Sequence, residues 1–358
     1  MSSELERLVS EVQDYWGLRR KQPIGKLVNI LRRDGFQCPH VLSSIGEDAA
    51  AIDLGGQNLI LLTTDAIVPE LAASNPHVAG YAAIMVNVND IYAAAGRPIV
   101  AMVNVAFTAM EVGVQMMQGI CEAGRKFRVQ VVRGHTTPDA PTNGVSASIC
   151  GVVGREDYVS AGGAQNGDSL ILAVDLEGRP SPNYQYGWDT TVLKSSEAVL
   201  HRYEAMRVLG AKKLLHASKD LSNGGIIGTL LLLLEYARRG ATVDLASVPC
   251  PPGMDLTSWL KMYISTGYVV TSDPKQARKV LDVFRLHDLT AAVIGSVDNS
   301  LKTVLRLGGE VRQIFDFAHD SIVAPPEPPQ LRCLAGANVL KRSRSSRNLG
   351  VNKRNKRL

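Results

Sequence analysis

The spacing of apolar residues alternates between strand and helix periods along most of the chain. Residues 4–35 carry apolar residues at helical spacing, and Gly35 ends this stretch. Between residues 41 and 153 the pattern switches repeatedly. The expected strands are 45–52, 58–64, 99–107, 129–133 and 145–153, and the expected helices are 77–95 and 112–127.

A glycine-rich stretch from Ala161 to Asp168 predicts a border between two domains. Beyond it we expect strands at 169–175, 214–218, 241–245, 267–272 and 290–297, and helices at 197–209, 224–238 and 274–287. This mosaic indicates an α+β protein of two domains with mixed sheets. The expected parts are a helical segment (1–40), an N-terminal domain (41–157), a C-terminal domain (158–325) and a tail (326–358).

The net charge of +5 belongs to the end of the chain. Eight Lys and Arg residues lie within the last eighteen positions, and without them the formal charge is −3. We expect this tail to be disordered, because it carries almost no apolar residues. It could bind nucleic acid or another acidic surface, or have no function of its own. The acidic body argues against nucleic-acid binding elsewhere.

The composition is that of an ordinary globular protein, and the sequence argues against several classes of protein. No apolar run reaches the roughly 20 residues of a membrane span. The first residues do not read as a signal peptide, so we expect a cytoplasmic protein without membrane contacts. The five cysteines are scattered without a C-x-x-C pair, which argues against a zinc site and a disulfide framework.

Short acidic motifs follow one another at the edges of apolar stretches. They are Gly46–Ala50 (GEDAA), Thr63–Asp65 (TTD) and Val86–Asp90 (VNVND). Taken singly, Asp65 is better explained as a helix or turn cap, and Asp90 as a core carboxylate satisfied by the backbone. Asn87 and Asp90 are three residues apart on a predicted helix and share one face. Several such acids in one domain favour a site where hard cations bridge phosphate oxygens.

Two further motifs carry groups suited to phosphate. Residues 133–137 (RGHTT) are expected to form a turn with hydroxyls beside a histidine. Residues 220–225 (DLSNGG) precede a strongly apolar predicted helix. A helix N-terminus opened by two glycines presents free N–H groups to an anion, although Ser222 or Asn223 could simply cap the helix. Lys219 is a further possible phosphate partner.

The order of these motifs, from GEDAAAI through VNVNDIYAAAGRPI to KDLSNGGIIGTLLLLLE, resembles the aminoimidazole ribonucleotide synthetase (PurM-like) superfamily. The similarity covers about residues 20–320. It implies an α+β fold of two domains, in which an N-terminal mixed sheet forms a dimeric barrel and an α/β sandwich follows. It also implies a homodimer that binds ATP with Mg²⁺ and acts on a small-molecule substrate.

The resemblance implies roles for individual positions. Metal binding falls to Asp48, Asp65 and Asp90. Catalytic roles fall to Asp48, His135 and Asp220. Contacts to the nucleotide fall to Asp65, Asn87, Gly134, Thr136, Thr137, Asn223, Gly224 and Gly225. Two departures matter: Glu47 replaces the usual first Asp of its motif, and His135 replaces the Asp of the kinase pattern. Neutral imidazole is a poor Mg²⁺ ligand, so His135 is either a phosphate donor, an acid–base group or a turn residue without chemistry.

The resemblance implies phosphoryl transfer from ATP that activates a small, nitrogen-containing metabolite, by a ligase or a kinase. The chain has no cysteine in the stretch Arg20–Lys26 and ends in Leu358, which disfavours selenophosphate synthetase and the hydrogenase-maturation dehydratase. A thiamine-monophosphate-kinase-like phosphotransferase and a non-catalytic nucleotide-binding scaffold remain alternatives. The aromatic loop at 183–191 either faces substrate or closes a domain edge.

Overall fold

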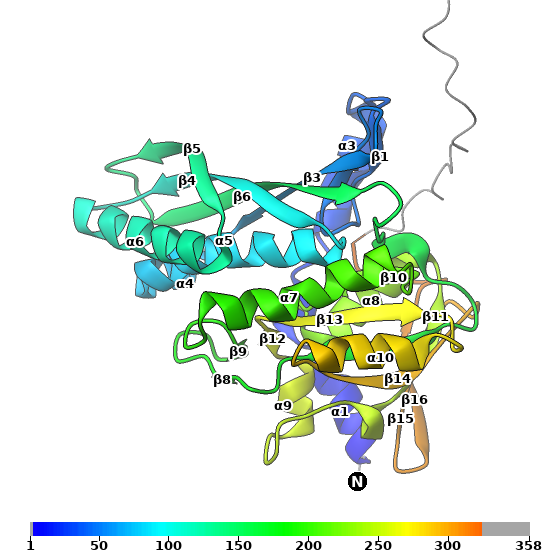
Figure 1. The fold of residues 1–358 in the computed structure, drawn as a ribbon. Helices are drawn as coiled ribbons and strands as arrows, with labels where there is room; N and C mark the ends of the chain where they lie inside the picture. The colour runs from blue at the N-terminus through cyan, green and yellow to red at the C-terminus, as the bar shows by residue number, and fades with distance from the viewer. Residues whose placement is uncertain (1–2, 324–358) are drawn as a thin grey trace, which may run out of the picture. The chain divides into compact units, whose positions relative to one another are not determined.

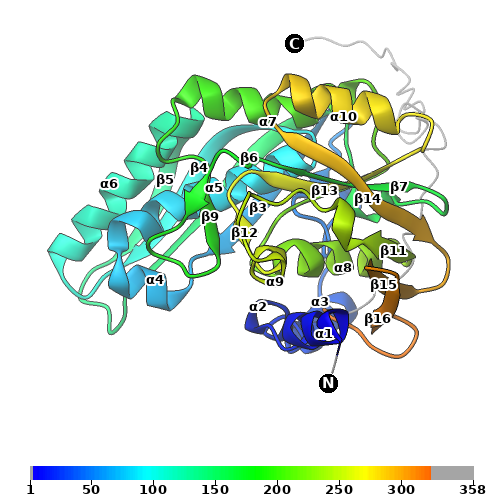
Figure 2. The ribbon, with the colours of Figure 1, turned by 90° about the horizontal axis from the view of Figure 1, so that it is seen from below.

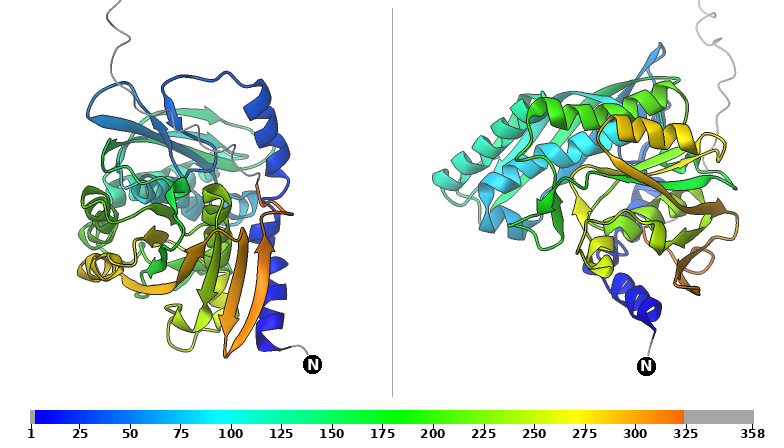
Figure 3. Two further views of the ribbon diagram at one scale, coloured as in Figure 1. Left: turned by 90° about the vertical axis from the view of Figure 1, so that its right-hand side faces the viewer. Right: turned by 60° about the horizontal axis from the view of Figure 1, so that its bottom comes forward.

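A computed structural model describes residues 3–323 of the chain. The expected basic tail (326–358) lies outside the described residues. The helical segment divides into α1 (Glu4–Gln13), α2 (Trp16–Arg19) and α3 (Ile24–Asp34). The Ser3 side chain caps α1 by accepting from the Glu6 N–H. Figure 3 shows α1 running beside the last two strands of the described chain, against which it buries Leu5 and Leu8.

The first sheet of the described chain has six strands in the order β1-β2-β3-β6-β4-β5. Its strands are β1 (Val41–Ser43), β2 (Ala50–Ile52), β3 (Asn58–Ala66), β4 (Arg97–Ala106), β5 (Gln130–Thr137) and β6 (Gly144–Gly154). Neighbouring strands are antiparallel except β4 and β5, so the sheet is mixed. In β6 burial alternates strictly, because successive side chains point to opposite faces.

The inner face of this sheet packs on two long helices. They are α5 (Pro76–Ala93) and α6 (Met110–Phe127), preceded by the short α4 (Pro69–Ser74). Figure 1 shows α5 and α6 between this sheet and α7 (Ser196–Ala211). Being covered on several sides, α5 is apolar around most of its circumference. A carboxylate on it, Asp90, is therefore exceptional.

The second sheet of the described chain has seven strands in the order β10-β13-β7-β14-β11-β15-β16. They are β7 (Ser169–Val174), β10 (Ala217–Asp220), β11 (Gly240–Asp244), β13 (Gly267–Ser272), β14 (Thr290–Asp298), β15 (Lys302–Leu307) and β16 (Glu310–Asp316). All six residues of β7 are buried, because helices cover both faces. Figure 2 shows α7 and α10 (Ala277–Leu286) on one side, with α8 (Gly225–Ala237) and α1 on the other.

A small third sheet holds the aromatic loop. It consists of β8 (Arg179–Pro180), β9 (Gly187–Asp189) and β12 (Tyr263–Ile264), with α9 (Leu256–Leu260) just before β12. The rings of Tyr184 and Tyr186 pack edge-on against Trp16 and Tyr15. The loop therefore closes an edge of the protein together with the N-terminal segment.

The structure corrects three boundaries. The expected strand at 45–52 is paired in the sheet only from Ala50, because Gly46 at φ +111° turns the chain before it. Residues 133–137 continue β5 instead of forming a turn. The expected strand at 214–218 begins and ends later, so Asp220 is its last residue. In the described part of the chain, no helix is long and apolar enough to cross a membrane.

Candidate metal and nucleotide site

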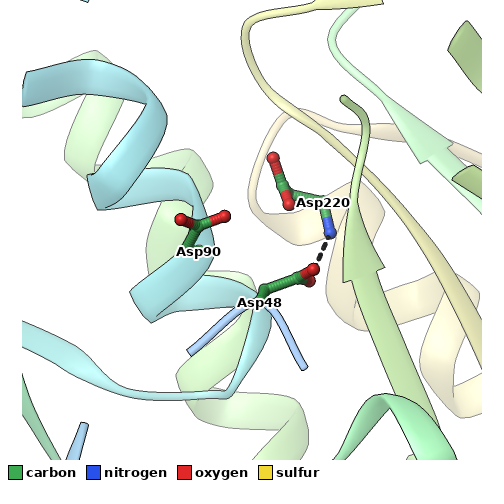
Figure 4. Close-up of side chains that lie close together, drawn as sticks. All are labelled: Asp48, Asp90 and Asp220. Carbon is green, nitrogen blue, oxygen red and sulfur yellow. Dashed lines mark hydrogen bonds between the residues drawn. The ribbon is translucent and has the colours of Figure 1, made fainter. Parts of the chain in front are cut away.

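Three carboxylates from three separate elements converge. Asp48 lies in the loop before β2, Asp90 on α5 and Asp220 at the end of β10. One oxygen of each lies within 4.8 Å of the others, and Figure 4 shows the three side chains facing one another. We call this group the acid cluster. Three carboxylates that repel one another at this distance form a site suited to a divalent cation.

Asp90 is held by a hydroxyl from the first sheet. Thr63 on β3 donates a short hydrogen bond to Asp90 Oδ2. Asp90 is only 8% exposed. Burial, followed by the charges of Asp220, Asp65 and Asp48, raises its pKa well above the usual range. Repulsion of this kind is what a bound cation would relieve.

A hydrogen bond from the backbone of Asp220 holds the side chain of Asp48. The Asp220 N–H donates to Asp48 Oδ2 over 3.2 Å, as drawn in Figure 4. Burial and the charge of Asp48 raise the pKa of Asp220 well above its usual range, and Lys219 opposes the shift. The pairing of β10 with β13 places Asp220 opposite Tyr268 and fixes its position at the end of the sheet.

Two lysines accompany the acids. The Lys219 ammonium forms a buried ion pair with Asp48 Oδ1 and lies 3.4 Å from the Gly46 carbonyl oxygen. Lys21, just beyond α2, interacts with the charges of Asp65 and Asp220, while burial and Lys219 lower its pKa. Sequence reasoning gave Lys21 no role, because nothing in the local pattern shows that the N-terminal segment reaches this site.

Asp65 and Asn87 flank the acid cluster. Asp65, near the end of β3, is solvent-exposed and stands outside the group, yet its charge contributes to the raised pKa of Asp90. Asn87 is fully buried on α5, one turn from Asp90, and its Nδ2 donates to the Ala83 carbonyl. Its Oδ1 has no hydrogen-bond partner among the described residues. An orphaned buried acceptor one helical turn from Asp90 fits the hydration shell of a Mg²⁺ ion.

Glu47 turns away from the acid cluster. Its carboxylate accepts from the Ser160 hydroxyl and, over 2.7 Å, from the Ala161 N–H at the start of η1 (Ala161–Gly163). Burial raises its pKa, and both hydrogen bonds oppose the shift. The longer arm of Glu47, relative to Asp, therefore serves as a tie between the loop and η1.

The RGHTT motif lies elsewhere on the first sheet. Gly134, His135, Thr136 and Thr137 are exposed on the edge strand β5. Along the register, Gly134 and Asp65 are separated by β4 and β6, which is about 14 Å at the usual strand spacing. His135 and Thr137 line a cavity of about 290 Å³ with Asn104 and Ser146, without any member of the acid cluster. Within one chain, the structure does not bring His135 to Asp48 and Asp220.

The DLSNGG motif adjoins the acid cluster. α8 begins at Gly225 with Gly224 as its N-cap, and the described residues supply no side chain that caps it. The expected cap from Ser222 or Asn223 is therefore wrong. A Cβ on Gly225 would lie 2.5 Å from the Leu260 carbonyl, and one on Gly17 would lie 2.1 Å from the Asn223 carbonyl. Backbone from α9 and from the N-terminal segment thus packs closely on this turn.

Several proteins of known sequence are similar to this chain. An uncharacterized protein of Methanocaldococcus jannaschii is 34% identical over 320 residues, which cover 89% of this chain and 98% of that protein. An uncharacterized protein of Synechocystis is 32% identical over 89% of this chain and 98% of its own length. Selenide, water dikinase of Dechloromonas aromatica is 29% identical over 58% of this chain and 60% of the enzyme.

Solved structures share the fold. Thermotoga maritima PurL complexed with ATP superposes with a TM-score of 0.71 at 18% identity, covering 91% of this chain. This chain spans about half of PurL, 53% of its length. AaThiL complexed with AMPPCP and TMP superposes with a TM-score of 0.60 at 17% identity, covering 82% of this chain and 98% of AaThiL. Both likenesses show the α+β fold of two domains.

Family models match most of the chain. The model of the AIR synthase related protein N-terminal domain matches residues 46–154, and that of the C-terminal domain matches residues 165–308. The first match contains Asp48 and Asp90, and the second contains Asp220. The chain therefore belongs to the AIR synthase related protein family, within the PurM-like superfamily.

Proposed function

We propose that this protein is an ATP- and Mg²⁺-dependent enzyme that activates a small nitrogen-containing metabolite by phosphoryl transfer. The observation that carries the proposal is the acid cluster, in which carboxylates from both halves of the chain lie within 4.8 Å. Selenide, water dikinase among the relatives, and the nucleotides named with PurL and AaThiL, support ATP as the phosphoryl donor.

Asp48, Asp90 and Asp220 would hold the metal, with Asp65 and Asn87 beside it. Bound Mg²⁺ would neutralise and orient the phosphates of ATP. The chain's own contribution is positioning: Thr63 fixes Asp90, and the Asp220 N–H fixes Asp48. Asn223, Gly224 and Gly225 would present backbone N–H groups to a phosphate at the start of α8. Lys219 and Lys21 would balance charge next to it.

A homodimer is part of the proposal. The face of the first sheet opposite α5 and α6 exposes Leu62, Met102 and Val132. Covering this face with the same face of a second copy would form the barrel expected from the family. It would also offer Gly134, His135, Thr136 and Thr137 of one copy a place in the nucleotide site of the other. This is consistent with their distance from the acid cluster within one chain.

The domain borders at 41–157 and 158–325, the α/β sandwich form of the second domain and a cytoplasmic location are also proposed. The family models, with matches ending at residue 154 and restarting at 165, support the border between the domains. The acceptor of the phosphoryl group decides between a ligase and a kinase. A screen of ATP consumption with pools of amides, amines and phosphorylated metabolites, followed by product identification, would make that decision.

Calorimetric titration of the full chain with AMPPCP, with and without Mg²⁺, tests the proposal. We expect Mg²⁺ to tighten nucleotide binding, and Asp90→Asn to remove this effect. Asp282→Asn, at an exposed acid on α10, is the matched control and should behave as wild type. A wild-type chain without Mg²⁺-dependent nucleotide binding would overturn the proposal. Nucleotide binding without ATP turnover on any metabolite pool would instead favour the scaffold alternative.

A further inference from the structure

Three polar side chains form a chain of hydrogen bonds from the protein core to the neighbourhood of Asp90. The Tyr203 hydroxyl on α7 donates to Asn89 Oδ1 on α5. Asn89 Nδ2 then donates to the Tyr263 hydroxyl on β12 over 3.2 Å. Tyr203 and Asn89 are almost fully buried, at 0% and 2% exposure. Asn89 directly precedes Asp90 on α5, and the charges of Asp220 and Asp90 act on the Tyr263 hydroxyl, so this chain ends near the acid cluster.

Tyr263 is held in place from two sides. Its N–H donates to the Tyr186 carbonyl over 2.7 Å, and β12 pairs in parallel with β9. The residues just before it, Leu260 and Lys261, pack on Gly225 so closely that a Cβ there would overlap them. Tyr263 therefore lies between the start of α8, which follows Asp220, and Asn89, which precedes Asp90.

The hydrogen-bond pattern fixes what the Tyr263 hydroxyl can do. Its oxygen accepts from Asn89, which leaves its proton to be donated. Among the described residues no hydrogen bond takes this proton. Burial, followed by the charges of Asp220, Tyr203 and Asp90, raises the pKa of Tyr263 well above its ordinary value. The raised pKa keeps the hydroxyl neutral, so it stays available as a hydrogen-bond donor.

We propose that the Tyr263 hydroxyl donates a hydrogen bond to an oxygen of the phosphoryl group that is transferred at the acid cluster. Tyr263 is then a catalytic residue, and Asn89 and Tyr203 are positioning residues that keep its oxygen occupied and its proton directed outward. The hydrogen bond strengthens as negative charge builds up on the phosphoryl oxygens, so it favours the transition state over bound ATP. No proton is transferred. This inference rests on the proposed function.

Tyr263→Phe removes the donor and keeps the ring. We expect its kcat for Mg²⁺-dependent ATP hydrolysis to fall about 10- to 100-fold, the effect of one hydrogen bond to a charged group, with KM changed less than about threefold. Its affinity for AMPPCP with Mg²⁺ should remain near that of wild type. Its affinity for ADP with aluminium fluoride, a mimic of the transferring phosphoryl group, should fall about tenfold or more.

Two further variants separate catalysis from folding. Tyr81 lies on α5, as Asn89 does, and its buried hydroxyl donates to Thr191. Tyr81→Phe is the control and should leave kcat, KM and both nucleotide affinities unchanged. Tyr203→Phe should lower kcat less than Tyr263→Phe does. Because Tyr203 acts through Tyr263, the double variant should be no slower than Tyr263→Phe alone, whereas independent structural effects would add.

These measurements distinguish a failure of the role proposed for Tyr263 from a failure of the proposed function. If wild type binds AMPPCP with Mg²⁺ but Tyr263→Phe keeps its kcat and its affinity for ADP with aluminium fluoride, the role of Tyr263 is refuted and the proposed function stands. Equal losses of AMPPCP and transition-state-mimic binding would also refute it, since they indicate structural damage. A wild type that binds no nucleotide would refute both.

Discussion

At the scale of single residues, a lysine occupies the side of the acid cluster where a cation is expected. Lys219 and Asp48 are both nearly buried, with side chains 8% and 9% exposed. Removing one partner leaves the other as an uncompensated buried charge. The ion pair should therefore stabilise the metal-free protein strongly and the metal-loaded protein much less.

Lys219→Met should lower the free energy of unfolding in EDTA by about 3–5 kcal/mol, the usual cost of breaking a buried ion pair. Saturating Mg²⁺ should restore most of this loss, since it neutralises Asp48 in place of the ammonium. Urea unfolding under both conditions measures the difference. Lys302→Met, which breaks a more exposed pair with Asp316, is the control and should cost less than about 1 kcal/mol. An equal loss with and without Mg²⁺ would contradict this prediction.

The raised pKa of Asp90 predicts a pH dependence in the absence of metal. A carboxyl whose pKa is higher in the folded state stabilises the fold below its unfolded pKa, and this contribution is lost as pH rises through the folded pKa. Asp90→Asn removes the loss, so in EDTA it should raise the Tm relative to wild type more at about pH 8 than at about pH 5.

Asp53→Asn serves as the comparison, because it should change the Tm in the opposite direction. Hydrogen bonds from Arg155 and from the Gly55 N–H lower the pKa of Asp53 to about 2. Its stabilising contribution is present above the unfolded pKa and is lost as pH falls, so this variant should lower the Tm at about pH 8. If Asp90→Asn changed the Tm by the same amount at both pH values, the raised pKa of Asp90 would be refuted.

At the scale of elements, α5 and α6 approach one another through their backbones. A Cβ on Gly119 would lie 1.9 Å from the His77 carbonyl, and one on Gly80 would lie 2.0 Å from the Met116 carbonyl. These close contacts set the position of the helix that carries Asn87 and Asp90. Packing of α5 thus determines the geometry of the acid cluster.

Gly119→Ala should destabilise the fold by about 1–3 kcal/mol, because the helices must separate to admit a methyl group. Mg²⁺-dependent AMPPCP binding should weaken as well, since Asp90 moves with α5. Chemical denaturation and calorimetry provide the two measurements. Gly144→Ala, where a Cβ would meet nothing within 4 Å, should not destabilise the fold. If both variants behaved alike, the proposed control of Asp90 by helix packing would fail.

Much of the element order could be predicted from sequence, because long periodic stretches such as α5, α6 and α8 carry strong local signals. Boundaries failed where long-range contacts decide them: pairing with β13 extends β10 to Asp220, and the parallel partner β4 keeps residues 133–137 in a strand. The motifs singled out all three members of the acid cluster. Thr63, Lys21 and Tyr263 escaped assignment, because nothing in their local sequence shows which residue each of them meets; the partner of Tyr263, Asn89, is 174 positions away.

At the scale of the whole molecule, the face of the first sheet that α5 and α6 leave uncovered exposes large apolar side chains, among them Leu62, Met102 and Val132. Leu62 on β3 is 42% exposed there and lies opposite Cys150 on β6. An open face of this kind is expected to be covered by a partner. The proposed partner is a second copy of this chain.

Leu62→Asp should convert the dimer to a monomer, because it buries an unpaired charge at the centre of the contact. Light scattering at micromolar concentration measures the mass, and AMPPCP binding should weaken about tenfold or more if a second copy completes the site. Leu286→Asp, at an exposed leucine on α10, should change neither. A monomeric wild type would argue against the dimer.

The N-terminal segment has a consequence for any shortened version of this protein. The family models begin at residue 46, which invites expression of 46–308 alone. Such a fragment would lack α1, the strand β16 on which α1 packs and whose Ile314 carbonyl accepts from Gln13, and Lys21. It would also remove Gly17 from the Asn223 turn. An inactive or insoluble fragment would therefore reflect the loss of these contacts and would not count against the proposed function.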